Sequence, residues 1–430
     1  MTDSATTEVT NAEVQATRPG VKRFIGIDFD LGSLRTAGPR YWGFVSLLGV
    51  FMAMGLVAFI LLTQRWGAVV AMRDTYPWGL WFINYMYFVG LSAGGLAVYA
   101  SVHLFGAEQY RPLARFAVLQ AGVLVMAALM GIASEIPGPM ARPDRMLQFL
   151  TRPNITSPFV YTGSAALIYM IICFFDLWVM ITGKGGHKLA FRMTLIALPF
   201  AIYLHTTTAF VLAMNKSREL WHSAVMVPIF LTSATASGIA LLVIFAYIVQ
   251  ATTKIHFKPS MFRSLSTLLA TVMIIDLFML VVEILTIYWQ TSAMTGHTIR
   301  FTAFLTGNYA WAFVPVLVLG GTAFAILSRR ETRHLPAVQL TASGLYVVAV
   351  FLKRYSLDAM GFVRTTLGQV SGNYWPSLTE VLLALGILAF GILVVTIGVR
   401  VLPLEEPEES EHEAETVHPE LSAEPVLEAR

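Results

Sequence analysis

The stretch WGLWFINYMYFVGLSAGGLAVYASVHLF, Trp78 to Phe105, decides the fold. It is almost entirely apolar, and about 20 apolar residues are enough to cross a bilayer as a helix. The chain contains ten runs of this kind, which lie at residues 42–63, 78–105, 113–133, 158–182, 189–213, 222–250, 262–290, 304–327, 336–352 and 377–401. The sequence therefore predicts an all-α integral membrane protein with ten transmembrane helices.

The composition supports this prediction. Hydrophobic residues make up 56% of the 430 residues and charged residues only 13%, whereas soluble domains carry about 25% charged residues. The single cysteine, Cys173, excludes disulfides, Cys-ligated iron–sulfur clusters and Cys-based zinc sites within this chain. The polar N-terminus lacks the apolar core of a signal peptide, so we do not expect one.

Charge divides the chain into three regions. Residues 1–40 form a polar N-terminal segment, residues 41–402 hold the apolar runs, and residues 403–430 form an acidic tail. The tail is rich in glutamate and poor in apolar residues, so we expect it to be disordered. A docking segment is the alternative interpretation of the tail.

The distribution of basic residues predicts the orientation in the membrane. The N-terminal segment and the gaps after the even-numbered helices carry more Lys and Arg than the opposite gaps. The positive-inside rule therefore favours cytoplasmic termini, and we expect a multi-pass protein of the bacterial inner membrane. The gaps after the odd-numbered helices are longer and chemically richer. We call their side the loop face, and we expect it to build a site or receive a partner.

Two of the helices echo each other in sequence. WGLWFINYMYFVGLSAGG begins at Trp78 and WHSAVMVPIFLTSATASG begins at Trp221, and the two stretches place small residues at matching positions. Small residues let helices approach closely. The echo predicts two similar four-helix units, formed by the second to fifth and the sixth to ninth helices.

Ionisable and amide side chains inside membrane spans are costly, so each is a functional candidate by default. Five polar residues fall in the half of the bilayer nearest the loop face, namely Asn84, Glu135, His205, Glu283 and Glu380. Asp276 lies nearer the midplane and Asp176 nearer the opposite face. With Glu283 and the threonines 206–208, these aspartates mark a candidate path for protons. The alternative for each is an ordinary hydrogen bond between helices.

The histidines argue against haem and for a different ligand. A bis-His haem needs two inward-facing histidines at matching depth, but only His205 lies well inside a span. The sequence also contains no Gly-rich phosphate loop, HExxH or CxxC motif. A polar pocket about one-third of the way in from the loop face suits a small amphipathic ligand such as a quinone. The quinone carbonyls need donors such as His or Asn, and its redox chemistry needs a nearby acid or base. A redox centre would then come from another subunit at the loop face.

Several motifs resemble one family. YPWGLWFINYMYFVGLSAGG, RPDRMLQFLTRPNITSPFVYTG, LHTTTAFVLAMNKSRELWHSAVMVPIFLTSATASG and the block that begins KRYSLDAMGF resemble the NrfD/PsrC family of quinone-interacting membrane subunits, over roughly residues 40–402. The ten-helix length and the C-terminal block are most similar to the HybB/DsrP-type branch.

The resemblance implies two four-helix bundles with flanking helices and a quinone site near the periplasmic face. Menaquinone or ubiquinone would be the bound substrate, with no haem and no iron–sulfur cluster in this chain. A ferredoxin-like iron–sulfur subunit would sit on the loop face. It would connect to a catalytic subunit of the molybdopterin, nickel–iron hydrogenase or heterodisulfide-reductase-like type. Membrane lipid would surround the chain, and no nucleic acid is implied.

The resemblance also implies site residues. The family's histidine in the fifth helix falls on His205, and its Trp-His entry to the next helix falls on Trp221 and His222. The acid that ends the third helix and the arginine of the following loop fall on Glu135 and Arg145.

The C-terminal motif that begins KRYSLDAMGF and the second helix contribute further expected site residues. The arginine and acid of the last block fall on Arg354 and Glu380. In the polysulfide reductase type a histidine of the second helix binds quinone, and this chain departs from that pattern because Tyr85 stands there, next to Asn84.

We therefore expect a membrane subunit that exchanges electrons between the quinone pool and an iron–sulfur partner. The expected quinone-binding residues are His205, Asn84, Tyr85, Glu135, Arg145, Trp221 and His222. The expected proton-transfer residues are Glu283, Asp276 and Asp176. Residues expected at the pocket mouth or docking surface are Arg354, Glu380 and Asn215. The rival interpretations are a proton or solute translocator without a redox role, and a membrane anchor that binds no quinone.

Overall fold

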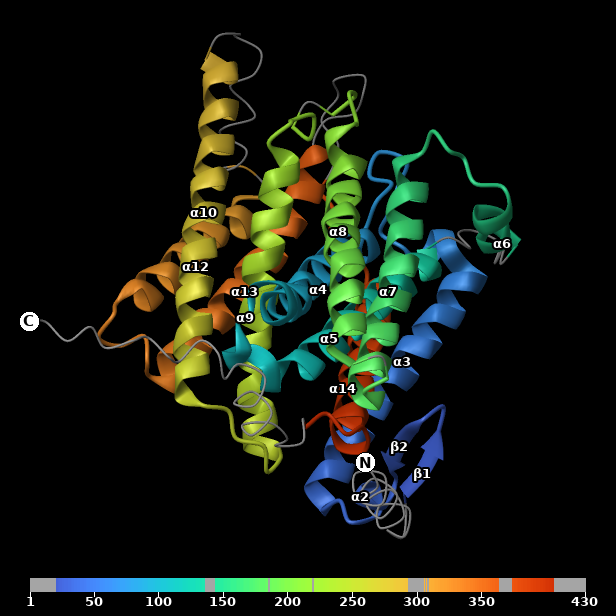
Figure 1. Ribbon diagram of the computed structural model, residues 1–430. Coiled ribbons are helices and arrows are strands. Elements are labelled where there is room, and N and C mark those ends of the chain that lie inside the picture. The colour runs from blue at the N-terminus through green and yellow to red at the C-terminus, as the bar shows by residue number, and fades with distance from the viewer. Residues whose placement is uncertain are drawn as a thin grey trace, which may run out of the picture.

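The computed structural model describes residues 21–135, 144–184, 186–218, 220–292, 305, 307, 309–362 and 373–405. Within them, ten helices are long and apolar enough to span a membrane, which confirms the predicted all-α membrane architecture (Figure 1). They are α3 (Pro39–Val69), α4 (Leu80–Phe105), α5 (Arg111–Glu135), α7 (Pro158–Thr182), α8 (Gly186–Ala213), α9 (Met226–Thr252), α10 (Pro259–Ser292), α12 (Ala310–Ser328), α13 (Pro336–Gly361) and α14 (Leu378–Val401).

The helices form two groups of four. In bundle 1, α4, α5, α7 and α8 pack on one another, and in bundle 2, α9, α10, α12 and α13 do the same. The α4–α9 contact joins the two bundles. This is the grouping that the similarity between the stretches beginning at Trp78 and Trp221 predicts.

A glycine contact brings α4 and α9 together. A Cβ atom on Gly94 would lie 2.0 Å from the backbone carbon of Gly238. Gly95 faces α5 in the same way, because a Cβ there would lie 2.2 Å from the Ala117 carbonyl oxygen. Backbone-to-backbone packing replaces the missing hydrophobic effect inside a bilayer, so these glycines fix the centre of the molecule.

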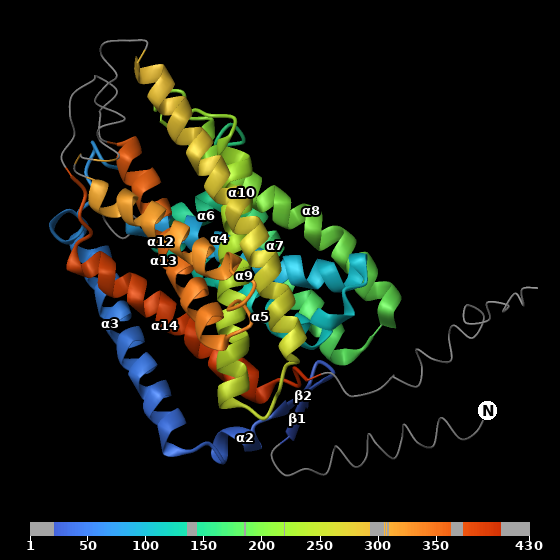
Figure 2. The same cartoon turned by 90° about the vertical axis from the view of Figure 1, so that its left-hand side faces the viewer.

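The first and last membrane helices form a flanking pair. Helices α3 and α14 run side by side along one edge (Figure 2). Their closest approach is at Gly55 and Gly386, where a Cβ atom on Gly55 would lie 2.7 Å from the Gly386 Cα. The pair packs on bundle 1 through α5 and α4.

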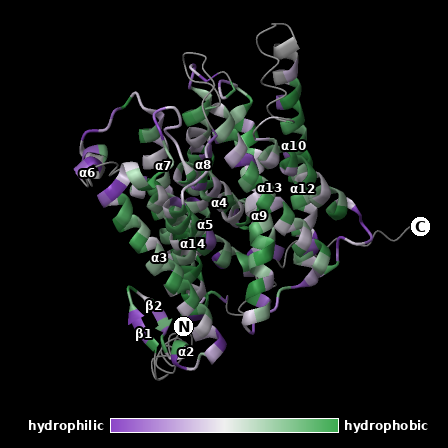
Figure 3. Ribbon diagram, turned by 180° about the vertical axis from the view of Figure 1, so that it is seen from behind, coloured by the Kyte–Doolittle hydropathy of each residue, from purple (hydrophilic) through white to green (hydrophobic). Residues whose placement is uncertain are grey.

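The two ends of the molecule differ. One end carries a short antiparallel hairpin of β1 (Val21–Phe24) and β2 (Ile27–Asp30), followed by α2 (Gly32–Arg35), and we call it the hairpin face. The other end is the loop face, where the amphipathic helix α6 (Asp144–Thr151) lies. Hydrophilic residues concentrate at the hairpin and at α6, while the helices between them are mostly hydrophobic (Figure 3).

One predicted boundary is wrong. The ninth span was expected to end at residue 352, but α13 continues to Gly361. Lys353, Arg354 and Asp358, which were assigned to a loop, therefore lie inside the helix and are buried. Charged side chains that have partners in the protein interior do not terminate a helix. A prediction based on apolar residues alone therefore placed the end of this helix too early.

Candidate functional site

Five aromatic rings gather at the loop face where the two bundles meet. The Trp78 ring stacks on the Trp221 ring, with a centroid distance of 5.0 Å and an interplanar angle of 5°. Phe82 of α4, Phe159 of α7 and Phe362 also contact Trp78, at centroid distances of 4.7, 5.4 and 5.4 Å. We call these five residues the aromatic cluster.

Trp221 anchors the cluster to α13. Its Nε1 donates a hydrogen bond to the Leu357 carbonyl oxygen at 2.8 Å, and the ring is fully buried. The ring lies directly on Gly361, where a Cβ atom would be 1.9 Å from Trp221 Cε2. Arg218 covers the outer side, with its guanidinium 4.8 Å from the Phe362 ring centroid. Partial burial lowers the pKa of Arg218.

Next to the aromatic cluster lies a carboxyl–tyrosine network. The Tyr76 hydroxyl donates to Asp358 Oδ2 at 3.1 Å, and the Tyr374 hydroxyl donates to Glu380 Oε1 at 3.1 Å. The two tyrosine rings stack with a centroid distance of 4.4 Å. Burial, and then the neighbouring carboxyl groups, raise the pKa of Tyr76 and of Tyr374 well above the ordinary value. Both phenols therefore keep their protons and act as donors.

Glu380 is held by its own helix. Its carboxylate accepts from the Ser377 backbone N–H at 2.6 Å, while the Ser377 hydroxyl accepts from the Glu380 N–H, which completes a capping box. A third carboxyl group joins the network, because Glu135 at the end of α5 lies within electrostatic reach of Glu380 and Asp358. Acids from α5, α13 and α14 therefore converge at the loop face.

Below the aromatic cluster, a short chain of hydroxyl groups crosses bundle 1. The Tyr85 hydroxyl lies 2.8 Å from Thr162 Oγ1, which in turn lies 2.8 Å from Thr208 Oγ1. Asn84 is buried on the same turn of α4. The structure therefore places Tyr85 and Asn84 in the protein interior.

His205 is buried on α8, as the sequence predicts, but both ring nitrogens face backbone carbonyls. Nδ1 lies 2.6 Å from the Ala201 oxygen and Nε2 lies 3.0 Å from the Val89 oxygen of α4. A neutral imidazole has one N–H, so only one of these contacts is a hydrogen bond unless the ring is protonated. His205 links α8 to α4 in this structure.

Arg354 of α13 approaches the same part of α4. Its Nη2 is 2.5 Å from Ser233 Oγ and 3.5 Å from the Phe230 carbonyl oxygen, and its guanidinium lies over the Phe230 ring. A Cβ atom on Gly90 would lie 3.9 Å from Nη2. Nε and Nη1 are buried with no hydrogen-bond partner among the described residues.

The predicted positions of Arg354 and Glu380 at a pocket mouth or docking surface are wrong. Both side chains are fully buried. Arg354 is carried inward because α13 is longer than expected, and Glu380 is drawn inward by the capping box and Tyr374.

Bundle 2 contains a buried ion pair. Lys353 Nζ lies 2.7 Å from Asp276 Oδ1, and the Tyr346 hydroxyl donates to Asp276 Oδ2 at 2.7 Å. The Thr232 hydroxyl lies 3.3 Å from Asp276 Oδ1. These groups come from α9, α10 and α13, so they bind three helices together. Asp276 is deep, as predicted, and its cationic partner was not foreseen.

A small cleft in bundle 2 reaches the lysine of this ion pair. Glu283 and Lys353 line it with mostly apolar neighbours, including Leu220, Met226, Phe313 and Leu357. Glu283 is half-buried and accepts a hydrogen bond from the Ser223 hydroxyl at 3.3 Å. Glu283 and Asp276 are therefore brought to one part of bundle 2.

Asp176 stands apart from these groups. It lies on α7 in bundle 1, is buried, and its Oδ1 has no hydrogen-bond partner within the part of the chain that the structure describes. Its electrostatic neighbours are Tyr99, Tyr169 and Cys173. The structure does not place Asp176 with Asp276 and Glu283, which belong to bundle 2.

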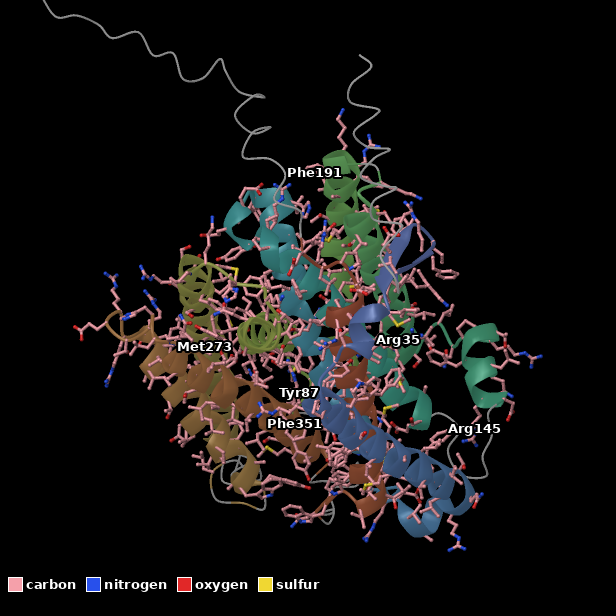
Figure 4. The ribbon with its side chains drawn as sticks, turned by 90° about the horizontal axis from the view of Figure 1, so that it is seen from below. Arg35, Tyr87, Arg145, Phe191, Met273 and Phe351 are labelled. Atoms are coloured by element: carbon pink, nitrogen blue, oxygen red, sulfur yellow. The ribbon has the colours of Figure 1, made fainter. Side chains whose placement is uncertain are left out.

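Three predicted residues lie at the surface. Arg145 is on α6, at the edge of the molecule and away from the helix core where Tyr87 and Phe351 meet (Figure 4). His222 is exposed, with Nδ1 2.9 Å from the Ala213 carbonyl oxygen. Asn215 is partly exposed, and its side chain accepts a hydrogen bond from the Ser217 hydroxyl. The structure does not bring these side chains to His205.

Sequence reasoning missed four residues of these networks, namely Tyr76, Lys353, Asp358 and Tyr374. The signal for Lys353 and Asp358 was present, because a helix that begins at Pro336 needs more than 17 residues to cross about 30 Å of hydrocarbon. The tyrosines carry no comparable signal, since aromatic residues are common at membrane boundaries. Among the described residues, no group of three His, Cys, Asp or Glu side chains is placed to hold a metal ion.

Comparisons with known proteins give the family. The profile described as "Polysulphide reductase, NrfD" matches residues 68–365. A Halobacterium salinarum protein provisionally named as a dimethyl sulfoxide reductase membrane subunit is 27% identical over 87% of this chain and 93% of its own length.

Two further relatives match over similar lengths. The Hdr-like menaquinol oxidoreductase integral membrane subunit of Archaeoglobus fulgidus is 26% identical over 85% of this chain and 94% of its own length. A selenate reductase subunit of Mesobacillus selenatarsenatis is 22% identical over 86% and 96%. The matched residues run from the end of α3 into the segment after α13, and so contain both four-helix bundles. With its ten apolar helices, the chain is a multi-pass integral membrane protein of the NrfD (polysulphide reductase) family.

Proposed function

We propose that this chain is the quinone-interacting membrane subunit of an oxidoreductase complex. The family and the membrane-subunit names of the relatives support this role in general. The observation that carries it is the pair of Arg354 nitrogens, Nε and Nη1, that are buried without a partner among the described residues. The Arg354 guanidinium also lies within electrostatic reach of His205. Quinone carbonyls need such donors, and a buried donor without a partner is costly unless a ligand or water satisfies it.

The headgroup would enter from the loop face. The partly exposed Trp78 ring would offer an apolar surface on the way in. One carbonyl would accept from Arg354, and the other from His205 once its ring nitrogen leaves the Val89 oxygen. Tyr85 and Asn84 lie on the adjacent turns of α4 and would complete the pocket.

The chemistry must move two electrons and two protons together. Oxidation of a quinol breaks two O–H bonds, sends two electrons to an iron–sulfur partner and releases two protons. Glu135 would accept the two protons one after the other and pass each to Glu380 or Asp358, which lie within electrostatic reach. Quinone reduction would use the same groups in the opposite direction.

A ferredoxin-like iron–sulfur subunit would dock on the loop face, where α6 exposes Leu147 and Arg145, and would link this chain to a catalytic subunit. The substrate would be menaquinone or ubiquinone. The loop face would be periplasmic in a bacterial inner membrane, with both termini in the cytoplasm.

A binding measurement tests the proposal. Quenching of a fluorescent menaquinol analogue would be measured on the purified complex, in wild type and in His205→Ala, Arg354→Gln and Glu135→Gln. The matched control is His256→Ala, since His256 is exposed beyond α9. We expect the dissociation constant to rise about tenfold or more in the first two variants and to stay unchanged in the control. Wild-type affinity in both variants, or no binding to wild type, would reject the site.

A second function, proton translocation, is favoured by a separate observation. The cleft that contains Glu283 reaches Lys353, which pairs with Asp276. We propose that this route loads protons into bundle 2 while quinone reacts elsewhere. In proteoliposomes with a trapped pH dye, Glu283→Gln should abolish quinol-driven acidification or alkalinisation and leave quinol oxidation intact. Unchanged pH signals would reject this route.

A further inference from the structure

The β1–β2 hairpin carries an unusual turn. Its two turn residues, Ile25 and Gly26, have φ angles of +52° and +81°. A β-branched residue at positive φ is a genuine outlier, because two-residue hairpin turns of this kind favour Asn, Asp or Gly. Ile25 therefore occupies a position that a smaller polar residue would fill with less strain. Observed strain of this kind calls for a functional explanation.

The strain presents apolar side chains at the tip of the hairpin. Phe24 is 65% exposed and Ile25 is 64% exposed, while Lys22 and Arg23 directly precede them. An exposed apolar tip flanked by cations is typical of a segment that rests in a membrane interface.

The tip is fastened to a membrane helix. Trp178 Nε1 donates to the Ile25 carbonyl oxygen at 2.9 Å, and β2 packs beside the ends of α7 and α14 (Figure 1). Trp178 lies about one turn before α7 ends at Thr182. Tryptophan at this depth marks the level of the lipid headgroups, so Phe24 and Ile25 also lie at that level.

Between the tip and α7 lies a shallow apolar groove that is largely open to its surroundings. It is lined by Ile25, Met170, Ile171, Phe174, Phe175 and Trp178. The helical spacing of the last five shows that the groove runs along α7 from the interface toward the hydrocarbon core. Ile171 and Phe175 are 58% and 42% exposed, so the groove opens on the lipid side.

A cation stands at the headgroup end of this groove. Lys184 Nζ lies 5.2 Å from the Trp178 ring centroid, in a cation–π contact. It also faces the hairpin turn, because a Cβ atom on Gly26 would lie 3.5 Å from it. The only acidic side chain paired with the hairpin cations within the described residues is Asp28, whose exposed contact with Arg23 is 3.7 Å long. Lys22, Arg23 and Lys184 outnumber the two acidic residues of the hairpin, Asp28 and Asp30, so the rim carries a net positive charge.

We propose that the hairpin and α7 together form a binding site for an anionic phospholipid. One acyl chain would lie in the groove, and the phosphate would contact Lys184. The apolar lining of the groove matches the acyl chain of such a lipid, and the cation at headgroup level matches its phosphate. The groove is open on its lipid side, so a lipid can enter it. The site is separate from the quinone chemistry, since it lies at the opposite face.

Lipid retention tests the proposal. The full-length protein would be released from nanodiscs that contain equal amounts of phosphatidylglycerol and phosphatidylcholine, and the retained lipids would be counted by native mass spectrometry. Lys184→Gln removes the rim cation. Ile25→Asn removes the apolar side chain at a position that Asn tolerates better, so the hairpin should still form. The control is Lys254→Gln, an exposed lysine at the same face beyond α9.

We expect wild type and Lys254→Gln to retain phosphatidylglycerol preferentially. Lys184→Gln should lower the retained phosphatidylglycerol at least threefold without changing phosphatidylcholine, and Ile25→Asn should lower both. Equal retention of the two lipids by wild type would overturn the anionic assignment. Equal losses in Lys184→Gln and Lys254→Gln would show general surface charge instead of a site, and would also overturn it.

Discussion

At the scale of single residues, the buried charges of bundle 2 are the most consequential feature. Asp276 and Lys353 neutralise each other in a region where an isolated charge would be costly. Replacing one partner leaves the other uncompensated, and such changes destabilise a protein by about 3–5 kcal/mol. Replacing both with apolar residues removes the charges altogether. Comparing the single and the double substitution therefore separates two effects on the free energy of unfolding. One is the destabilisation by an unpaired buried charge, and the other is the net contribution of the intact ion pair.

The prediction is that Asp276→Asn melts well below wild type and that Asp276→Leu with Lys353→Met recovers most of the loss. Melting of the purified protein in detergent checks it, with activity measured in parallel. If the double variant regains stability but still does not move protons, the ion pair takes part in proton transfer. A double variant as unstable as the single one would mean that an unpaired charge is not what destabilises Asp276→Asn.

Residue identities were predicted better than their partners. His205, Asp276 and Asn84 were expected inside the membrane and are buried there. The Val89 carbonyl that faces His205 and the lysine that pairs with Asp276 were not expected. These partners lie 116 and 77 residues away along the chain, and no local pattern connects residues at such separations.

At the scale of helices, the α4–α9 crossing is the most demanding contact. Gly238→Ala would place a Cβ atom 2.2 Å from the Gly94 nitrogen. Backbone atoms cannot move aside as a flexible side chain can, so the helices must separate and the bundles must lose contact. We expect this variant to fail to accumulate in the membrane or to melt a few degrees lower, since each kcal/mol of lost stability shifts the melting temperature of a chain of this length by about 1 °C.

The matched control is Gly344→Ala on α13, where a Cβ atom meets nothing within 4 Å. Alanine is favoured over glycine in a helix by about 1 kcal/mol, so this variant should be as stable as wild type or slightly more stable. Thermal unfolding followed by size-exclusion chromatography measures both. Equal behaviour of the two variants would show that the crossing tolerates expansion.

Removing the N-terminal cap of α14 should lower the stability by a smaller amount. Ser377 caps this helix and positions Glu380, which in turn accepts from Tyr374. Ser377→Ala should cost about 1 kcal/mol of stability, as losses of such caps do. If Glu380 also takes part in proton exchange, the same variant should slow quinone-linked turnover. The control is Ser328→Ala at the end of α12, whose hydroxyl donates to the Ala325 carbonyl of its own helix.

Helix boundaries show where sequence patterns suffice. Length and apolar content predicted ten spans, and all ten are helices. The pattern failed on α13 because its last turns are rich in charged residues, and their burial depends on α9 and α10. The hairpin of residues 21–30 was not predicted either, since each of its strands is only four residues long.

At the scale of the whole molecule, the two bundles repeat one arrangement. Trp78 and Trp221 begin the echoed stretches and stack on each other. Glu135 and Glu283 lie equally far from the first residues of α5 and α10. His205 and Arg354 both lie about two turns before the ends of α8 and α13, and each contacts a carbonyl of its bundle's first helix. Equivalent positions thus carry different chemistry, which favours different tasks for the two bundles.

The orientation of this arrangement in the membrane is open to a direct test. Cys173 is buried, so the wild-type protein provides a low background for thiol labelling. Thr156→Cys places a thiol on the loop face, and Lys254→Cys places one on the hairpin face; both positions are exposed. With cytoplasmic termini, a membrane-impermeant maleimide should label Thr156→Cys in cells whose outer membrane alone is permeabilised, and should label Lys254→Cys only after the inner membrane is broken. The reverse pattern would put the loop face in the cytoplasm, and the electron-transfer partner would then have to be a cytoplasmic protein.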